Sequence, residues 1–197
     1  MTESPADSPR ASRRGTTVAI QLGAIAVLLL VVVWVNLHAA EHDLVREIAV
    51  RFGYPGILLA AAVSGFNLVV PVPIIAFFPF FMEVGFHRVL TVVVIAAGMT
   101  MGDLLGYLIG HAARDVMAPR RLGLVERLER LRERRPYLPF AVMFLYAAFA
   151  PIPNEVLVIP LAFLRYPLGA IFTAVLLGNI IFNGLVAMGV LGLFDLL

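Results

Sequence analysis

Five stretches of the chain are almost free of charge, and short polar or charged segments separate them. The stretches cover 17–37, 54–82, 89–111, 138–164 and 168–194. An α-helix needs about 20 residues to cross the hydrocarbon core of a bilayer, and each stretch reaches that length. The pattern predicts an all-α integral membrane protein. Residues 1–16 are expected to be a disordered cytoplasmic tail, and 17–37 an uncleaved transmembrane helix, because the apolar core of a signal peptide is shorter.

Two of these stretches are interrupted by proline. Pro71 and Pro73 lie in 54–82, and Pro151 and Pro153 lie in 138–164. Non-helical backbone at membrane depth is tolerated only where protein or a water-filled cavity satisfies its polar groups. We therefore expect two re-entrant helical hairpins whose tips face each other or a cavity. Residues 41–52, charged on one helical face and apolar on the other, predict a short interfacial helix before the first hairpin.

If the two proline-broken stretches are re-entrant hairpins, the chain crosses the membrane three times, and the distribution of arginines favours that topology. With three crossings (17–37, 89–111 and 168–194), twelve arginines lie on the side of the N-terminus and only three, at 46, 51 and 88, lie opposite. That distribution follows the positive-inside tendency. The loop 112–137 carries eight of the twelve, and its Leu124, Leu128 and Leu131 have helical spacing, with Glu126 and Arg130 placed to pair at i,i+4. It is expected to be cytoplasmic, either as a topology determinant alone or as a binding surface for anionic headgroups.

An internal repeat relates the two halves at an offset of 80 residues. Pro71 and Pro73 then fall on Pro151 and Pro153, and the other matched positions are Phe66 with Tyr146, Phe86 with Tyr166, Gly98 with Gly178, and Asp103 with Asn183. Each half reads as a hairpin followed by a spanning helix, and the two hairpins would open on opposite sides. The predicted domain at 38–197 is therefore an inverted repeat, an arrangement that places the central site of many transporters at the helix breaks.

Composition excludes several classes. Apolar and aromatic residues make up 61% of the chain and charged residues 14%, against about 45–50% and about 25% in soluble domains. There is no cysteine, so neither a disulfide nor a thiolate metal site can form. We expect no enzyme, because Ser64 has no Gly-x-Ser-x-Gly context and the membrane segments carry no phosphatase or zinc motif. No cofactor, metal or nucleic-acid partner is expected.

Residues 98–110 carry a more specific signal. They follow the pattern Gly-xxx-Gly-Asp-xxx-Tyr-xx-Gly, directly after a proline-broken hairpin. In this the chain resembles the DedA family of bacterial membrane proteins, which shares the VTT domain with eukaryotic lipid scramblases. The resemblance covers about 54 to 194. It implies translocation of a lipid or a lipid phosphate such as undecaprenyl phosphate, in some members with protons, and a bacterial cytoplasmic membrane as the location.

The chain departs from the family pattern in the placement of an acid and of an arginine. The family usually has an acid just after the first Pro-x-Pro, where this chain has Ile74 and Ile75, and the acid appears instead as Glu155. The family often has an arginine before the second hairpin's proline, where residues 147–149 are Ala-Ala-Phe.

Glu155 is the strongest candidate for chemistry. A carboxylate at mid-membrane costs about 2.5–3.5 kcal/mol on insertion scales, so a protonated or water-exposed group is expected. Glu155 would then bind a proton or substrate with Asn154. The alternative is structural, since Pro153, Asn154 and Glu155 are typical of the first turn of a half-helix. The free N–H groups of that turn would offer an anion site.

Asp103 is the second candidate, for proton relay or headgroup contact, with Asn183 as its repeat mate and Tyr107 one turn away. Its alternative role is to satisfy the backbone of the facing hairpin. Four glycines spaced by four residues share its helix and are expected to let another helix pack closely: Gly98, Gly102, Gly106 and Gly110.

The sequence therefore predicts a membrane lipid transporter, of flippase or scramblase type, with proton coupling as an option. Its partners would be membrane lipids and protons, and a homodimer is compatible with the length. Two alternatives stay open: an exporter of small solutes, drugs or cations with the same architecture, and a membrane scaffold without transport.

Overall fold

The computed structural model describes residues 30–38, 41–65, 74–116 and 123–194, together with positions 23 and 27. The predicted tail at 1–16, the first part of the helix expected at 17–37, and Pro71 and Pro73 lie outside the described residues. Within them all regular structure is helical, which confirms the all-α class. The elements are a helix at residues 30–38, α2 (Asp43–Gly65), the 3-10 helix η2 (Ile74–Phe77), α3 (Phe78–Val84), α4 (Arg88–Val116), α5 (Gly123–Arg134), α6 (Leu138–Phe149), α7 (Glu155–Phe163) and α8 (Leu168–Phe194).

Three of the described helices are long and apolar enough to cross a membrane: Asp43–Gly65, Arg88–Ala112 and Leu168–Leu193. The second and third correspond to the helices expected at 89–111 and 168–194. The first joins two elements that the sequence separates, the interfacial helix at 41–52 and the first arm from 54. The helix breaks where they meet, because Gly53 has φ 53° and ψ −148° and Pro55 follows. Pro55 has no N–H to donate to the preceding turn, which favours this break.

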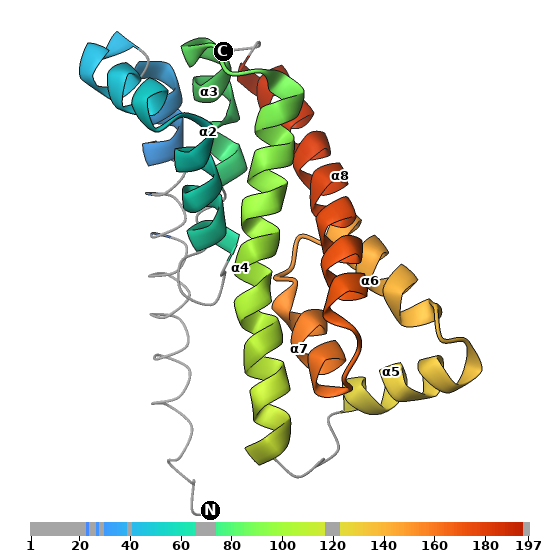
Figure 1. Ribbon diagram of the computed structural model, residues 1–197. Helices are drawn as coiled ribbons and strands as arrows, with labels where there is room; N and C mark the ends of the chain where they lie inside the picture. The colour runs from blue at the N-terminus through green and yellow to red at the C-terminus, as the bar shows by residue number, and fades with distance from the viewer. Residues whose placement is uncertain are drawn as a thin grey trace, which may run out of the picture.

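The long helix α4 lies at the centre of the arrangement (Figure 1). It packs against α2, α7 and α8, and α6 packs against α8. In Figure 1, α6 and α7 run in different directions, and the chain between them turns back beside α4. The rings of Phe140, near the start of α6, and Tyr166, just after α7, have centroids 5.2 Å apart. The start of α6 and the end of α7 therefore lie close together, and we call the two helices the α6–α7 unit.

The apolar core has two separate parts. The first lies where α2, η2, α3 and α4 meet and includes Ile57, Phe78 and Ile95. The second lies among α6, α7 and α8 and includes Met143 and Leu161. The two groups of buried side chains hold the shorter helices against α4 and α8.

The helices α3 and α7 end in the same way. Gly85 and Arg165 both have a positive φ, 105° and 58°. Gly85 and Phe86 donate backbone N–H groups to the carbonyls of Met82 and Phe81, and the residues 80 positions later repeat both bonds, Arg165 to Ala162 and Tyr166 to Leu161. These are the two bonds of a Schellman C-cap, which satisfies the last carbonyls of a helix. Each cap ends a short helix, and a long helix, α4 or α8, begins a few residues later.

Asn36 connects the first described helix to the start of α3. Its side-chain amide donates to the carbonyl of Ala76 at 3.0 Å, and its Oδ1 accepts from the backbone N–H of Phe80 at 3.0 Å. The first N–H groups of a helix have no partner within the helix. Asn36, which is buried, therefore caps α3 from a distant part of the chain.

The amphipathic helix α5 contacts α6 and α7. Leu128 is buried and Leu131 is partly buried, as their helical spacing predicts, whereas Leu124 is exposed. The predicted pair of Glu126 and Arg130 is present at 3.7 Å.

Arg132, also on α5, holds the end of α7. It donates to the carbonyl of Leu164 at 3.3 Å and lies 5.1 Å from the centroid of the Tyr166 ring. A cation over an aromatic face is attracted by the ring electrons. α5 is thus attached to the α6–α7 unit where α7 ends.

Candidate functional site

A buried carboxyl group stands at the meeting point of α4, α7 and α8. Asp103 of α4 accepts two hydrogen bonds on Oδ2, from the amide of Asn154 at 3.0 Å and from the amide of Asn179 at 3.3 Å. Asn154 directly precedes α7 and Asn179 belongs to α8. The three side chains are nearly inaccessible, with exposed fractions of 4%, 9% and 2%. Three helices are thus joined through one carboxyl oxygen.

The network continues from Asn179 to a hydroxyl. The Asn154 amide also donates to Oδ1 of Asn179 at 3.1 Å, and the Asn179 amide donates to Oγ1 of Thr100 at 3.0 Å. A side-chain amide has two N–H donors. The donors of both asparagines are therefore used within the cluster, which fixes their orientation around Asp103. We call Thr100, Asp103, Asn154, Glu155 and Asn179 the polar cluster.

Glu155 completes the cluster as a second buried carboxyl group, with 3% of its surface exposed. It lies in the first turn of α7, beside Asn154, and interacts electrostatically with Asp103. Its side chain packs against α4 at Gly106, where an added Cβ would lie 3.0 Å from Glu155 Cγ. Among the described residues no group of three or more histidine and acidic side chains could hold a metal ion.

A cavity of about 300 Å³ adjoins the polar cluster. Asn154 and Asn179 line it, together with Ser64 at the end of α2. The rest of the wall is mainly the non-helical segment between α6 and α7 and apolar side chains: Met99, Ala147, Ala150, Pro151, Ile152, Pro153 and Phe182. The tip of the α6–α7 unit therefore faces a cavity with polar groups on its wall.

Comparison with protein-family models, with curated proteins and with solved structures finds no match for this chain. The function is therefore inferred from the residues themselves.

The predicted site residues do not all join the cluster. Asn183 is fully buried, and its amide donates to the carbonyl of Asn179 at 2.7 Å and to Sδ of Met99 at 3.5 Å. Its Oδ1 has no hydrogen-bond partner among the described residues. Tyr107 donates its hydroxyl to the carbonyl of Tyr166 at 3.0 Å and stacks on His111, so it connects α4 to the turn after α7. Asn183 lies next to the cluster, and Tyr107 lies outside it.

The predicted glycine stripe on α4 contacts two different helices. An added Cβ at Gly98 would meet Leu58 and Ala61 of α2, and at Gly110 it would lie 2.5 Å from the Ile159 carbonyl of α7. Gly106 faces Glu155, and Gly102 is buried. One side of α4 thus approaches α2 near one end and α7 near the other, with Asp103 between the two contacts.

Three of the N–H groups near the start of α7, where an anion site is expected, already have acceptors within the chain. Those of Val156 and Leu157 already donate to the carbonyls of Pro153 and Asn154, at 3.2 and 3.0 Å, and Val158 also donates to Asn154. The Asn154 side chain does not cap the helix either. It points instead to Asp103, so the polar cluster offers amides and carboxyl groups.

Sequence reasoning missed Asn179, Thr100 and Ser64. Two of them have a signal in helical spacing, because side chains three or four residues apart share a face. Thr100 precedes Asp103 by three residues, and Asn179 precedes Asn183 by four in a helix that has no charged residue. Ser64 has no comparable signal. It is buried and its Oγ accepts from the backbone N–H of Ile74 at 3.4 Å.

Proposed function

We propose that the protein is a membrane lipid transporter of the DedA/VTT type, which moves a lipid headgroup past the polar cluster. The observation that carries the proposal is the pair of buried acids, Asp103 and Glu155, of which Asp103 accepts hydrogen bonds from the two amides, Asn154 and Asn179, that line a cavity. Asp103 lies on α4 and Asn179 on α8, and both helices are apolar enough to cross a membrane.

The cost of burying these acids supports a functional role. Each carboxylate in the membrane costs about 2.5–3.5 kcal/mol on insertion scales. A purely structural junction would need only neutral amides and hydroxyls to satisfy the backbone at the tip. Acids in such a place commonly mark a substrate or proton pathway. Protonation of Glu155 or Asp103 would change the charge of the cluster, and with it the preferred headgroup position.

The predicted inverted repeat has support in matched packing. Gly98 approaches the Leu58 carbonyl and Ala61, and Gly178 approaches the Phe144 carbonyl and Ala147. The second glycine follows the first by 80 positions, and both contacted residues shift by 86. With the matched ends of α3 and α7, this favours two copies of one unit, in which the first arms are six positions out of step with the rest. Residues 54–82 and 138–164 would be the two re-entrant hairpins.

The topology that we propose places the N-terminus and α5 in the cytoplasm of a bacterial cell. The basis is the arginine distribution, because positively charged loops tend to remain inside. The chain has no native cysteine, so a single introduced one reports its own side. Glu83→Cys and Arg130→Cys, which replace exposed residues, should react with an impermeant maleimide from opposite sides of the membrane. Reaction from one common side would overturn the two-hairpin topology.

In the proposed mechanism the two hairpins alternately open the cavity to either side of the membrane. The headgroup enters beside Asn154 and Asn179, while the acyl chains stay in the bilayer. The groups described around the Asp103 carboxyl are the amides of Asn154 and Asn179 and the acid Glu155, so we expect the cluster to suit a proton or a headgroup that donates hydrogen bonds better than a bare phosphate. A proton taken up by Glu155 would accompany each cycle in a proton-coupled carrier.

The same observation favours one alternative. Two buried acids behind the amides that line a cavity of about 300 Å³ would also suit a small cationic solute or drug. A transporter of lipids requires a lateral opening to the bilayer, whereas an exporter of solutes encloses its path. A scaffold without transport would keep the network and move neither.

The deciding experiment is lipid translocation in liposomes of phosphatidylethanolamine and phosphatidylglycerol with a fluorescent lipid, with and without a pH gradient. Glu155→Gln is compared with Glu83→Gln, a matched change at an exposed acid. The expected result is translocation by the native chain that Glu155→Gln abolishes or uncouples from the gradient, while Glu83→Gln has no effect. Absence of lipid movement, with uptake of a cationic solute, would replace the proposal by the exporter.

A further inference from the structure

A second hollow lies away from the polar cluster, on the side of the molecule where α2 bends. It has a volume of about 480 Å³. The helix at residues 30–38, α2, η2 and α3 supply its wall, with Phe86 from the turn after α3. It shares no lining residue with the cavity beside Asn154. We call it the apolar groove.

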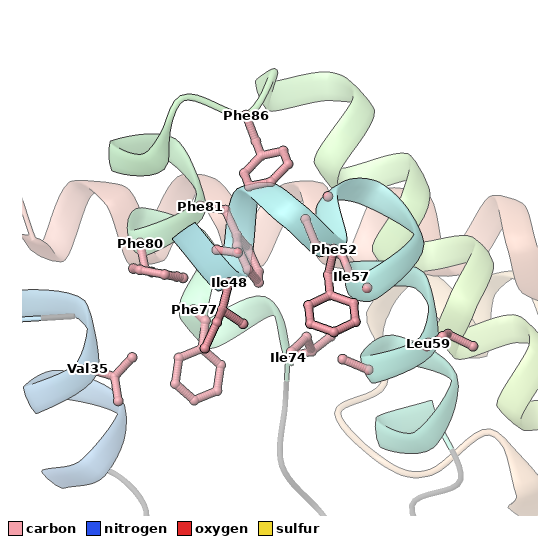
Figure 2. Close-up of a pocket in the computed structure, with 14 residues that line it drawn as sticks. Val35, Ile48, Phe52, Ile57, Leu59, Ile74, Phe77, Phe80, Phe81 and Phe86 are labelled. Carbon is pink, nitrogen blue, oxygen red and sulfur yellow. The ribbon is translucent and has the colours of Figure 1, made fainter. Parts of the chain in front are cut away.

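Every residue that lines the apolar groove is apolar. In Figure 2, Phe52 and Ile57 of α2 and Ile74 and Phe77 of η2 border one space, with Val35 of the first helix at its edge. The bend at Gly53 creates the hollow, because it separates the two parts of α2 that line it, around Ile48 and around Leu59.

The charge on the bent helix indicates how a ligand would be oriented. Arg46, Glu47 and Arg51 are exposed and line a separate depression at the same helix segment that contributes Ile48 and Phe52 to the groove. Such a helix lies in the membrane interface with its apolar face toward the acyl chains. The groove would therefore be at the depth of acyl chains, directly below charges that can pair with a phosphate and an amine.

We propose that the apolar groove is a binding site for one acyl chain of a membrane phospholipid, whose headgroup lies at Arg51 and Glu47. The lining offers no side-chain hydrogen-bonding group, so a peptide segment bound in extended form would bury unsatisfied backbone groups at a cost of several kcal/mol. A hydrocarbon chain has no such cost. The site depends on the membrane location of the chain, and it is independent of the proposed transport.

The experiment is photolabelling by a phospholipid with a diazirine in one acyl chain, diluted in vesicles of phosphatidylethanolamine and phosphatidylglycerol. The chain contains arginine but no lysine, so trypsin releases the residues between Arg51 and Arg88 as one peptide that holds most of the groove. Lipid that only surrounds the protein labels residues by exposure, and Val63, at 70%, would exceed the partly buried Ile74 and Phe77. A bound chain labels Ile74 and Phe77 more strongly than Val63.

Two matched variants on α2 complete the test. Ala60→Phe places a ring in the groove, and Val63→Phe places the same ring on an exposed position outside it. The expected result is loss of label at Ile74 and Phe77 in Ala60→Phe only. Label that follows exposure in the native chain, or that survives Ala60→Phe in a protein with unchanged helix content, would overturn the proposal. Because labelling needs no translocation, failure of this site and failure of the transport function are distinguishable.

Discussion

Asn154 donates a hydrogen bond of 3.0 Å to Oδ2 of Asp103, although 51 positions separate the two residues in the chain. The bond joins the tip of the α6–α7 unit to the central helix α4. It is buried, and a hydrogen bond to a charged group is worth about 1.5–3 kcal/mol. If the tip moves away from α4 to open the cavity, this hydrogen bond must break, or Asp103 must move with Asn154. The protonation state of Asp103 is therefore expected to influence the position of the tip.

Asp103→Asn tests whether the charge of this carboxyl matters or only its hydrogen bonds. Asparagine keeps an acceptor oxygen for Asn154 and has the size of aspartate. We expect the variant to remain folded and to lose the pH dependence of lipid translocation, measured in liposomes at several pH values. The control is Asn179→Ala, which removes a hydrogen-bond donor of the cluster and should lower the free energy of unfolding by about 1–3 kcal/mol. Native transport by Asp103→Asn at every pH would assign Asp103 a structural role only.

The helices that lie within one segment were predictable, because their signals are local. The uncharged stretches gave α4 and α8, leucine spacing gave α5, and the start of α7 followed from Pro153-Asn154-Glu155. The partners of these helices were not predictable to the same degree. Asp103 was identified as a candidate, but its bonds to Asn154 and Asn179 depend on how three helices pack.

Asn36 shows the same limit more clearly. It is one polar residue near the end of an apolar stretch, where an asparagine at the membrane surface would be unremarkable. Its partners Ala76 and Phe80 lie 40 and 44 positions away, on a short helix that the sequence shows only as part of a hairpin. No local pattern relates a side chain to a backbone group at that distance.

Asn36→Leu is expected to destabilise the start of α3. It leaves the Phe80 N–H and the Ala76 carbonyl without their partner in apolar surroundings, at a cost of about 1–3 kcal/mol for each group. Val84→Cys provides a buried thiol at the end of α3 for maleimide labelling in detergent. Labelling should be faster when Asn36→Leu is added, and unchanged when the exposed neighbour Leu37 is replaced by alanine. Equal rates in both would show that the bonds to Asn36 are dispensable.

Two glycines of α8 should respond to alanine in opposite directions. A Cβ at Gly178 would lie 2.5 Å from Ala147 Cβ, so Gly178→Ala forces α6 and α8 apart at a cost of about 1–3 kcal/mol. Within the described residues, no atom lies within 4 Å of an added Cβ at Gly184, and alanine there favours the helix by up to about 1 kcal/mol. Thermal unfolding in detergent measures both. If Gly178→Ala is as stable as Gly184→Ala, the close approach of α6 and α8 is not required.

Arg165 offers a test of the equivalence between the ends of α3 and α7. Its φ of 58° lies in the left-handed region, where a side chain other than glycine costs about 1–2 kcal/mol. Glycine is present at the matching position, Gly85, with φ 105°. We expect Arg165→Gly to raise the unfolding temperature and Gly85→Ala to lower it, because both turns need the same conformation for their two hydrogen bonds. The opposite changes are informative because they share one cause. If Arg165→Gly destabilises the protein, contacts of the arginine side chain outweigh the strain of its backbone, and the two turns are equivalent in geometry but not in energy.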